Sequence, residues 1–552
     1  MTSPSYVAGP SDRPLLGRTI GNQLDRTAQE HPSADAVVSL HQGVRRTYAE
    51  LRDDVDRAAR SLLALGVEPR DRVGIWSPNR YEWAVAQYAT AKVGANLVNI
   101  NPAYRSHELR HALGSVGVSV LFAAHAFHDA DYVRMLDEVR SELPGLRRVV
   151  LLDGPTPAWA ITWRAFEGLG EGVAASALAE RSASLDPDDP INIQFTSGTT
   201  GLPKAATLTH HNVLNNGALV GARLGYTPSD RVCMPVPFYH CFGMVLGNLA
   251  SVVHAATVVL PAESFDARAC LDAIDGERCT SVYGVPTMFI AMLEEPGFEG
   301  FDLASLRTGV MAGAPCPVEV MRQVIERMHA REMTICYGMT ETSPVSFQTR
   351  RDDDLERRVS TVGTVHPWVE AKVIEPTTRR TVPRGIAGEL CTRGYLVMRG
   401  YWGDPAATRE AIDEAGWLHS GDLAMMREDG AVQIVGRLKD MIIRGGENVY
   451  PREIEEFLFT NPKIADVQVV GVPDPKYGEA VCAWVMLHPG QTATEDEIRA
   501  FCRGRIATYK IPRYVRFTTS FPMTVTGKIQ KYRMREISIE ELGLGERVAT
   551  GA

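Results

Sequence analysis

Residues 194–204 read Gln194-Phe195-Thr196-Ser197-Gly198-Thr199-Thr200-Gly201-Leu202-Pro203-Lys204. The two glycines permit tight turns and a close approach of the backbone to an anion. The hydroxyl groups and exposed backbone N–H groups can surround phosphate oxygens, and Lys204 adds a positive charge. The spacing differs from that of a Walker A loop, which has Gly-Lys-Ser/Thr after a four-residue spacer. A polar linker is the alternative, because the turn 186–190 is rich in Asp and Pro, but the order of hydroxyl, Gly, Pro and Lys favours a phosphate-binding loop.

The chain before this loop alternates helix and strand patterns. Thr47 and Glu50 have the spacing of a capping box, which predicts a helix through Leu63. Such regular alternation predicts a parallel sheet with helices on both faces. The expected strands are Arg72–Trp76, Leu97–Ile100 and Val118–Ala124, and the expected helices are Tyr81–Val93 and Ser106–Val116, the latter capped by Ser106.

The C-terminal part of the chain has a different pattern, that of a compact α+β domain. A charged stretch, residues 436–440, joins it to the rest. We therefore predict a flexible tail (1–17), a large domain (18–436), a hinge (437–440) and a small domain (441–552). The expected elements of the small domain are a helix over Pro451–Leu458, strands over Ala465–Val472 and Ala480–Leu487, and a helix capped by Thr494 and Glu497.

The composition of the 552 residues is that of an ordinary globular protein, with 45% hydrophobic residues and a net charge of −9. This charge does not favour binding to nucleic acid. The longest apolar stretch, Val245–Leu260, is interrupted by polar residues, so no transmembrane segment is expected. The nine cysteines include no Cys-x-x-Cys pair, which predicts reduced thiols and a cytoplasmic protein. Lysine is scarce, so a lysine inside a motif is less readily explained as interchangeable surface charge.

The loop at 194–204 resembles the signature loop of the adenylate-forming superfamily, which includes acyl-CoA synthetases, adenylation domains of peptide synthetases and firefly luciferase. Further motifs of that superfamily follow in the expected order, from near Thr47 to near Lys531. Residues 445–451 and 471–479 resemble bacterial fatty-acyl-CoA synthetases and medium-chain acyl-CoA synthetases most closely. One departure is Ala205, where the family usually has Gly. The resemblance implies an α/β fold with a large multi-sheet N-terminal domain and a smaller mobile α+β C-terminal domain.

The segment Tyr337-Gly338-Met339-Thr340-Glu341 follows an apolar strand, Met333–Cys336. It therefore lies at the carboxyl end of a strand, where open α/β sheets bind ligands. By resemblance, Tyr337 packs on adenine, Thr340 contacts the α-phosphate and Glu341 binds Mg²⁺, a cation that prefers carboxylate oxygen. The resemblance also assigns adenine binding to Gly313-Ala314-Pro315 and ribose binding to Asp422 and Arg437.

Residues 237–243 resemble the acyl-pocket segment of the family. The resemblance places Phe238, Tyr239 and His240 around the acyl chain, together with Val285. A single histidine among aromatic residues is more often a packed core residue than a catalyst. We therefore interpret His240 as a gate or wall of the pocket, not as a general base.

Lys528 lies in the segment Thr524-Val525-Thr526-Gly527-Lys528-Ile529 and resembles the reactive lysine of the family. Its long stem and compact charge can reach both an attacking carboxylate and the α-phosphate. A preorganised cation in a dry site contributes several kcal/mol of barrier lowering. Lys439 matches the hinge position, with the neighbouring Asp440 as an alternative. Gly445 and Gly446 would offer little bulk in the path of a thiol.

These observations lead to the hypothesis of a fatty-acid–CoA ligase. It would use MgATP to convert a medium- or long-chain fatty acid to acyl-AMP and pyrophosphate, and then transfer the acyl group to coenzyme A. The alternatives are a ligase that delivers acyl-AMP to a carrier protein, a CoA ligase for an aryl, alicyclic or dicarboxylic acid, a luciferase-like oxygenase, and an inactive ATP-binding regulator. The expected partners are small molecules, and a homodimer is one candidate assembly.

Overall fold

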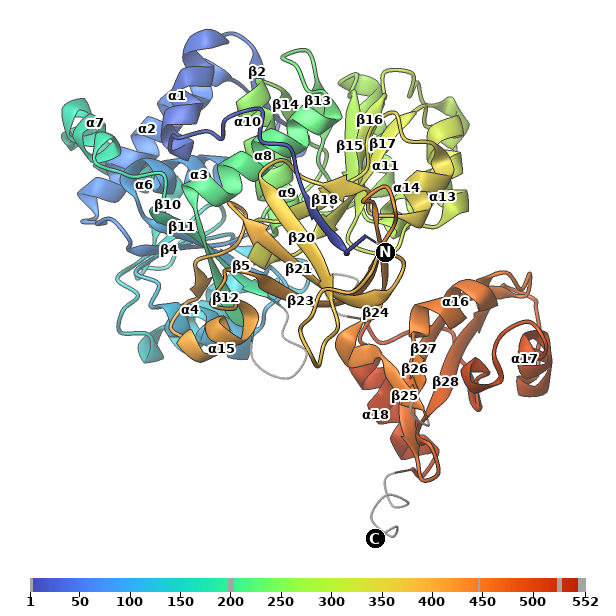
Figure 1. Ribbon diagram of the computed structural model, residues 1–552. Coiled ribbons are helices and arrows are strands. Elements are labelled where there is room, and N and C mark those ends of the chain that lie inside the picture. Colours follow the sequence, from blue (N-terminus) through green and yellow to red (C-terminus); the bar gives the residue numbers. More distant parts are fainter. Residues whose placement is uncertain (1–2, 197–202, 445–446, 524–528, 545–552) are drawn as a thin grey trace. The chain divides into compact units, whose positions relative to one another are not determined.

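The computed structural model describes residues 3–196, 203–444, 447–523 and 529–544 (Figure 1). The chain forms two compact units. The larger unit consists of Val7–Ala371 and Thr392–Leu418, and the smaller unit of Met1–Tyr6, Lys372–Cys391 and His419–Ala552. Both contain helices and several sheets, which confirms the predicted α/β class. Among the described helices, none has the length and apolar character needed to cross a bilayer.

An eight-stranded sheet of the larger unit has the order β10-β9-β6-β4-β5-β11-β12-β22. Strands β10 to β11 in this order pair in parallel, as predicted, but β12 and β22 are antiparallel to their neighbours. The antiparallel edge arises because the short segment 197–203 joins β11 directly to β12, whereas parallel neighbours need a crossover of about a dozen residues or more. The strands are β10 (Ile161–Thr162), β9 (Arg148–Leu151), β6 (Val120–Ala123), β4 (Arg72–Trp76), β5 (Asn96–Ile100), β11 (Pro190–Thr196), β12 (Lys204–Thr209) and β22 (Gly400–Tyr401).

A nine-stranded sheet of the same unit has the order β19-β18-β17-β16-β15-β13-β14-β2-β3. Its central strands, from β17 to β2, are parallel, so their carboxyl ends meet at one edge. The strands are β19 (Thr364–Val365), β18 (Val345–Gln348), β17 (Glu332–Gly338), β16 (Thr308–Ala312), β15 (Ser281–Gly284), β13 (Arg231–Cys233), β14 (Thr257–Leu260), β2 (Asp35–Ser39) and β3 (Val44–Thr47).

The predicted helices of the first part of the chain are present. α2 (Tyr48–Ala64) begins with the predicted capping box of Thr47 and Glu50, and α3 spans Tyr81–Val93. The prediction that Ser106 caps α4 (Ser106–Val116) is wrong. Ser106 is the first residue inside the helix, and its hydroxyl donates to Glu138 at 2.6 Å.

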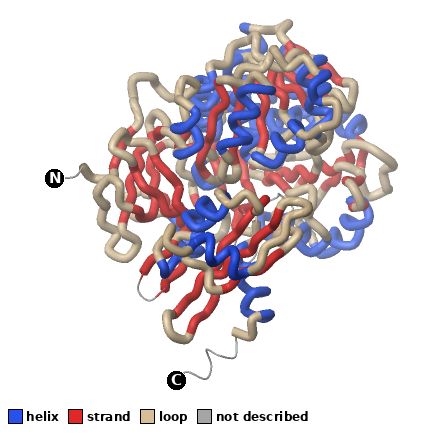
Figure 2. Tube along the Cα trace, turned by 90° about the vertical axis from the view of Figure 1, so that its right-hand side faces the viewer, coloured by secondary structure: helices blue, strands red, loops and turns tan. Residues whose placement is uncertain are grey.

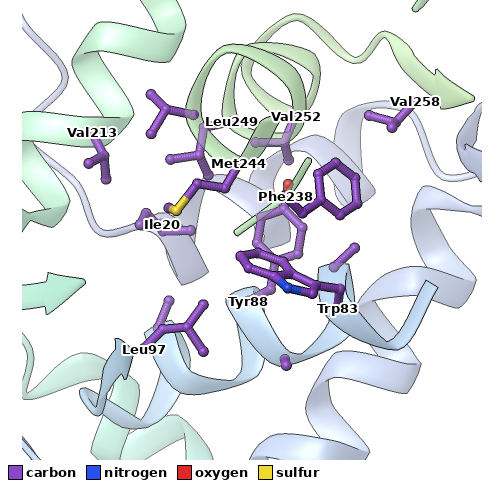
Figure 3. Close-up of a cluster of buried hydrophobic side chains, with 14 of the residues drawn as sticks. Ile20, Trp83, Tyr88, Leu97, Val213, Phe238, Met244, Leu249, Val252 and Val258 are labelled. Atoms are coloured by element: carbon purple, nitrogen blue, oxygen red, sulfur yellow. The ribbon is translucent and has the colours of Figure 1, made fainter. Parts of the chain in front are cut away.

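One hydrophobic cluster packs against the eight-stranded and the nine-stranded sheet of the larger unit, and Figure 3 shows part of it. Helices α1 (Ile20–Glu30), α3, α8 (His210–Leu224) and α10 (Ala250–His254) contribute to it, together with β5 and β14. Full burial of one large apolar side chain contributes about 1.5–3 kcal/mol, so this cluster holds the two sheets in one body. Figure 3 labels Ile20, Trp83, Tyr88, Leu97, Val213, Phe238, Met244, Leu249, Val252 and Val258.

A second cluster covers the nine-stranded sheet where β15, β16 and β17 lie side by side. Leu271, Phe289 and Met321 reach it from three helices, and α11 and α13 are seen beside these strands in Figure 1. The remaining helices of the larger unit are α5 (Tyr132–Val139), α6 (Trp163–Leu169), α7 (Ala175–Ala183), α9 (Cys241–Gly243), α11 (Ala267–Gly276), α12 (Pro286–Leu293), α13 (Val318–Arg327), α14 (Leu355–Ser360) and α15 (Pro405–Ala411).

A five-stranded sheet built mostly from the smaller unit has the order β1-β20-β21-β23-β24. Part of the predicted N-terminal tail, residues 1–17, forms its edge strand β1. A short 3₁₀ turn, Leu438–Asp440, follows β24 at the predicted hinge, and the hinge itself stays a prediction. The strands are β1 (Tyr6–Ala8), β20 (Val369–Ile374), β21 (Ala387–Gly394), β23 (Leu418–Met426) and β24 (Val432–Arg437).

The C-terminal residues form the α+β elements that the sequence predicts. Their strands have the order β26-β25-β28-β27, with β29 beside β28. Figure 2 shows strands of this part lying side by side above the C-terminus. The strands are β25 (Ile442–Arg444), β26 (Glu447–Val449), β27 (Ile464–Asp474), β28 (Gly478–Leu487) and β29 (Tyr514–Phe517), and the helices are α16 (Pro451–Phe459), α17 (Glu495–Cys502) and α18 (Lys531–Glu541).

We predict that Gly309→Ala destabilises the protein. A Cβ atom at Gly309, the second residue of β16, would lie 2.1 Å from the backbone oxygen of Val282 in β15, so the two strands would have to move apart. Overpacking of this kind costs about 1–3 kcal/mol. Urea unfolding followed by circular dichroism should therefore show a lower midpoint than that of the wild type.

Gly168→Ala is the matched control, because a Cβ atom at Gly168 in α6 meets nothing within 4 Å. Alanine stabilises a helix interior by about 0.5–1 kcal/mol relative to glycine. The urea midpoint of Gly168→Ala should therefore equal or exceed that of the wild type. An unchanged midpoint for Gly309→Ala would contradict the packing described for β16.

Candidate functional site

The predicted phosphate loop leaves and re-enters the eight-stranded sheet at one pair of residues. Thr196, at the end of β11, pairs with Lys204, at the start of β12. The Thr196 hydroxyl donates to the backbone oxygen of Lys204 at 3.3 Å. Between them, Pro203 is half-buried, whereas Ser197, Gly198, Thr199, Thr200, Gly201 and Leu202 lie outside the described residues.

Tyr401 connects this loop end to the predicted metal-binding carboxylate. The ammonium group of Lys204 lies over the Tyr401 ring, 5.1 Å from its centroid. The Tyr401 hydroxyl donates to Glu341 Oε1 at 2.8 Å. Burial and the neighbouring Glu341 carboxylate raise the pKa of Tyr401, so its hydroxyl stays protonated and remains a donor. The structure thus brings together Lys204 and Glu341 through a residue that the sequence analysis did not identify.

Glu341 is held in a short 3₁₀ turn, Thr340–Thr342, after β17. It is 5% exposed, and its backbone oxygen accepts from the N–H of Met398 at 3.0 Å. Because Tyr401 binds one carboxylate oxygen, the other remains a hard oxygen donor of the kind that Mg²⁺ prefers. The chemistry of Glu341 therefore fits a magnesium ligand.

The predicted adenine-binding segments meet at the carboxyl edge of the nine-stranded sheet. Ala312 at the end of β16 pairs with Cys336 in β17, so Gly313, just after β16, lies beside Tyr337, near the end of β17. Gly313 has a φ of +87°, which favours glycine, and a Cβ atom there would lie 3.2 Å from Val285 Cγ1. Small residues therefore leave the backbone accessible at this edge. Ala314 and Pro315 follow Gly313 in the same loop, and Met339 follows Gly338.

Three of the four predicted acyl-pocket residues lie in the loop before α9, and the fourth, Val285, directly precedes α12. Phe238 is fully buried and its ring is 5.5 Å from that of Trp83, so part of this segment belongs to the core. Tyr239 follows, and its backbone oxygen accepts from the side chain of Asn99 at 3.0 Å. His240 caps α9, and its Nδ1 accepts from the backbone N–H of Phe242 at 3.1 Å. Acyl binding by Phe238, Tyr239, His240 and Val285 stays a prediction.

The predicted ribose-binding residues are neighbours in the smaller unit. Asp422 in β23 pairs with Arg437 in β24, and Arg437 Nε lies 3.2 Å from Asp422 Oδ1. The Asp422 backbone N–H is held by the Ser420 hydroxyl at 3.1 Å. In the 3₁₀ turn that follows, partial burial lowers the pKa of Lys439. Gly445, Gly446 and Lys528 lie outside the described residues.

Comparison with known proteins gives matches along nearly the whole chain. The AMP-binding enzyme family matches residues 24–402, and the AMP-binding enzyme C-terminal domain matches residues 453–528. A putative acyl-CoA synthetase, YngI of Bacillus subtilis, is 48% identical over 96% of this chain and 99% of its own length. The mitochondrial medium-chain acyl-CoA ligase ACSF2 of Danio rerio is 46% identical, covering 98% of this chain and 91% of its own. The anthranilate CoA ligase AuaEII, solved with anthranoyl-AMP, has a TM-score of 0.84 and 25% identity, covering 96% of this chain and 99% of its own.

We predict that Tyr401→Phe weakens binding of ATP in the presence of Mg²⁺ by about 10-fold, as loss of a residue that orients a metal ligand typically does. The phenyl ring keeps the contact with Lys204, but Glu341 loses the hydroxyl that orients it. Isothermal titration calorimetry with and without Mg²⁺ measures the effect. Without the cation, Tyr401→Phe and wild type should bind ATP equally.

Tyr401→Leu is the companion variant, because it removes the ring as well as the hydroxyl. It should weaken ATP binding with and without Mg²⁺. Equal losses for the Phe variant under both conditions would contradict a role through Glu341.

Proposed function

Because the chain belongs to the AMP-binding enzyme family, we propose that it converts medium- or long-chain fatty acids to acyl-CoA thioesters. Membership of this family makes it an ATP-dependent, AMP-forming ligase. One observation supports acyl-CoA as the product. The chain is similar, over 96% and 98% of its length, to two proteins named as acyl-CoA synthetase or ligase. The fatty-acid substrate follows from the medium-chain name of one relative and from the motif resemblance.

In the first half-reaction, a carboxylate oxygen of the acid would bond to the α-phosphorus of ATP while the bond to the pyrophosphate oxygen breaks. The loop from Thr196 to Lys204 would bind the β- and γ-phosphates, with its ends held together by the β11–β12 pair. A Mg²⁺ ion held by Glu341 would neutralise phosphate charge. Lys528 would contact the acid and the α-phosphate, so the protein would act by positioning and electrostatics.

Asp422 and Arg437 would bind the ribose. An aspartate carboxylate can accept from two neighbouring hydroxyls, and Arg437 already contacts Asp422 Oδ1. Adenine would lie at the edge where Gly313 follows β16 and Tyr337 lies near the end of β17.

In the second half-reaction, the thiol of coenzyme A would attack the acyl carbonyl and AMP would leave. A site that holds Lys528 against the acyl-AMP has little room for the thiol arm. Rotation of the small domain about Lys439 would withdraw Lys528 and bring Gly445 and Gly446 to the thiol path. Domain movements of this kind gate many enzymes.

An assay with ATP and a panel of acids tests this function. Pyrophosphate release should be fastest for straight-chain fatty acids, and thioester should form when free coenzyme A is added. Faster release with aryl, alicyclic or dicarboxylic acids would reject the proposed substrate class. Pyrophosphate release without any thioester from free coenzyme A would point to delivery to a carrier protein.

We predict that Lys528→Ala slows acyl-AMP formation by about 10²–10³-fold, the loss typical for removal of one electrostatic stabiliser. Thioester formation from acyl-AMP supplied to the enzyme should change much less. Lys531→Ala is the matched control, since Lys531 is three residues away and its ammonium pairs with Glu455 at 2.6 Å. Near wild-type adenylation by Lys528→Ala would refute the role of Lys528.

Lys439→Pro should have the opposite pattern. Proline fixes φ and should restrict rotation at the hinge, so adenylation should persist while thioester formation falls. Lys439→Ala removes the charge but leaves the backbone free, and it should retain both half-reactions. An equal loss of both half-reactions in Lys439→Pro would place the hinge elsewhere, with Asp440 as the next position to test.

A further inference from the structure

Three side chains with different metal-binding atoms converge within the smaller unit. Glu389 and Cys391 are alternate residues of β21, so they lie on the same face of the strand. His419 lies on the neighbouring strand β23. Among the residues that the structure describes, these form the one group of three His, Cys, Asp or Glu side chains whose ligand atoms all lie within 4.8 Å of one another.

Two of the three distances between the ligand atoms are close to those of a tetrahedral metal site, and the third is no more than 4.8 Å. His419 Nδ1 lies 3.1 Å from Glu389 Oε2 and 3.6 Å from Cys391 Sγ. A tetrahedral Zn²⁺ ion, bound at about 2.3 Å by sulfur and about 2.1 Å by nitrogen and oxygen, keeps its ligand atoms roughly 3.3–3.6 Å apart. The three side chains therefore need little movement to bind one ion.

The charge of Glu389 also favours a cation at this position. Glu389 is 7% exposed, and buried carboxylates are normally paired with a cation or bound to a metal. Within the described part of the chain, its one ion-pair partner is His419, whose charge depends on protonation. Its second oxygen accepts from the backbone N–H of Gly421 at 3.2 Å. None of the described arginine or lysine side chains forms an ion pair with Glu389.

We propose that Glu389, Cys391 and His419 bind one thiophilic divalent cation such as Zn²⁺. On binding, the Cys391 thiol loses its proton to the solvent, and thiolate sulfur, imidazole nitrogen and carboxylate oxygen become the ligands. A water molecule takes the fourth position. Mg²⁺ prefers sites made of oxygen ligands, so this site is chemically distinct from Glu341.

The proposed site lies beside the part of β23 that carries Asp422. Glu389 binds the N–H of Gly421, and the Ser420 hydroxyl donates to the backbone oxygen of Leu390 at 2.6 Å. A cation bound to Glu389 would thus hold β21 and this part of β23 together. The proposal concerns metal binding alone and does not depend on the acid that the enzyme activates.

Titration of the full-length chain with Co²⁺ tests the proposal, after removal of metals by a chelator and in the presence of excess Mg²⁺ and a non-chelating reductant. We expect one Co²⁺ per chain, a near-ultraviolet band from charge transfer between sulfur and cobalt, and loss of that band when Zn²⁺ is added. Cys391→Ser should abolish the band. Glu389→Gln and His419→Gln keep the Cys391 thiol, but each should weaken Co²⁺ binding by at least about 10-fold.

Cys241→Ser is the matched control. Cys241 Sγ also lies 3.6 Å from a histidine Nδ1, that of His240, but this pair belongs to no three-ligand group among the described residues. This variant should retain the band. Circular dichroism checks the folding of every variant. If Cys391→Ser does not fold, the Co²⁺ affinities of Glu389→Gln and His419→Gln test the proposal. A wild-type chain without the band, a band that survives in Cys391→Ser, or unchanged Co²⁺ affinity in both glutamine variants would overturn the proposal.

Discussion

The antiparallel pairing of Thr196 with Lys204 is the constraint on which the candidate nucleotide site depends. It fixes both ends of the phosphate loop at neighbouring positions of a rigid sheet. Because β12 pairs on its other side with β22, the same register places Tyr401 beside the strand that begins with Lys204. Tyr401 in turn reaches Glu341, which belongs to a turn after a strand of the other sheet. The β11–β12 hairpin thereby links Lys204, Tyr401 and Glu341, which lie far apart in the chain.

Tyr401 also shapes the electrostatics of this region. A buried carboxylate is costly unless its oxygens are satisfied, and the Tyr401 hydroxyl satisfies one oxygen of Glu341 without neutralising its charge. The face of the same ring contacts the exposed Lys204 ammonium, an attraction worth about 0.5–1 kcal/mol. An aromatic ring can thus contact both charged groups without the mutual charge compensation that a direct ion pair would bring.

Local sequence patterns predicted local structure well, and long-range contacts explain where the structure differs from the prediction. The capping box of Thr47 and Glu50 and the strand Arg72–Trp76 depend on neighbouring residues, and both are present. Ser106 does not cap its helix, because its hydroxyl finds Glu138, a residue 32 positions away. The resemblance identified Asp422 and Arg437, which lie together in the structure. Tyr401 escaped detection because its partner is 60 residues away, and no pattern near Tyr401 indicates that contact.

The hydrophobic cluster of Figure 3 limits how the larger unit can be recombined with relatives. Leu97 enters it from one sheet and Val258 from the other, while Phe238 comes from the segment that resembles an acyl pocket. Protein interiors are packed as densely as organic crystals, so a chimera joined between the sheets would bring together side chains that had not been selected to interlock. Exchanged segments should therefore carry both sheets.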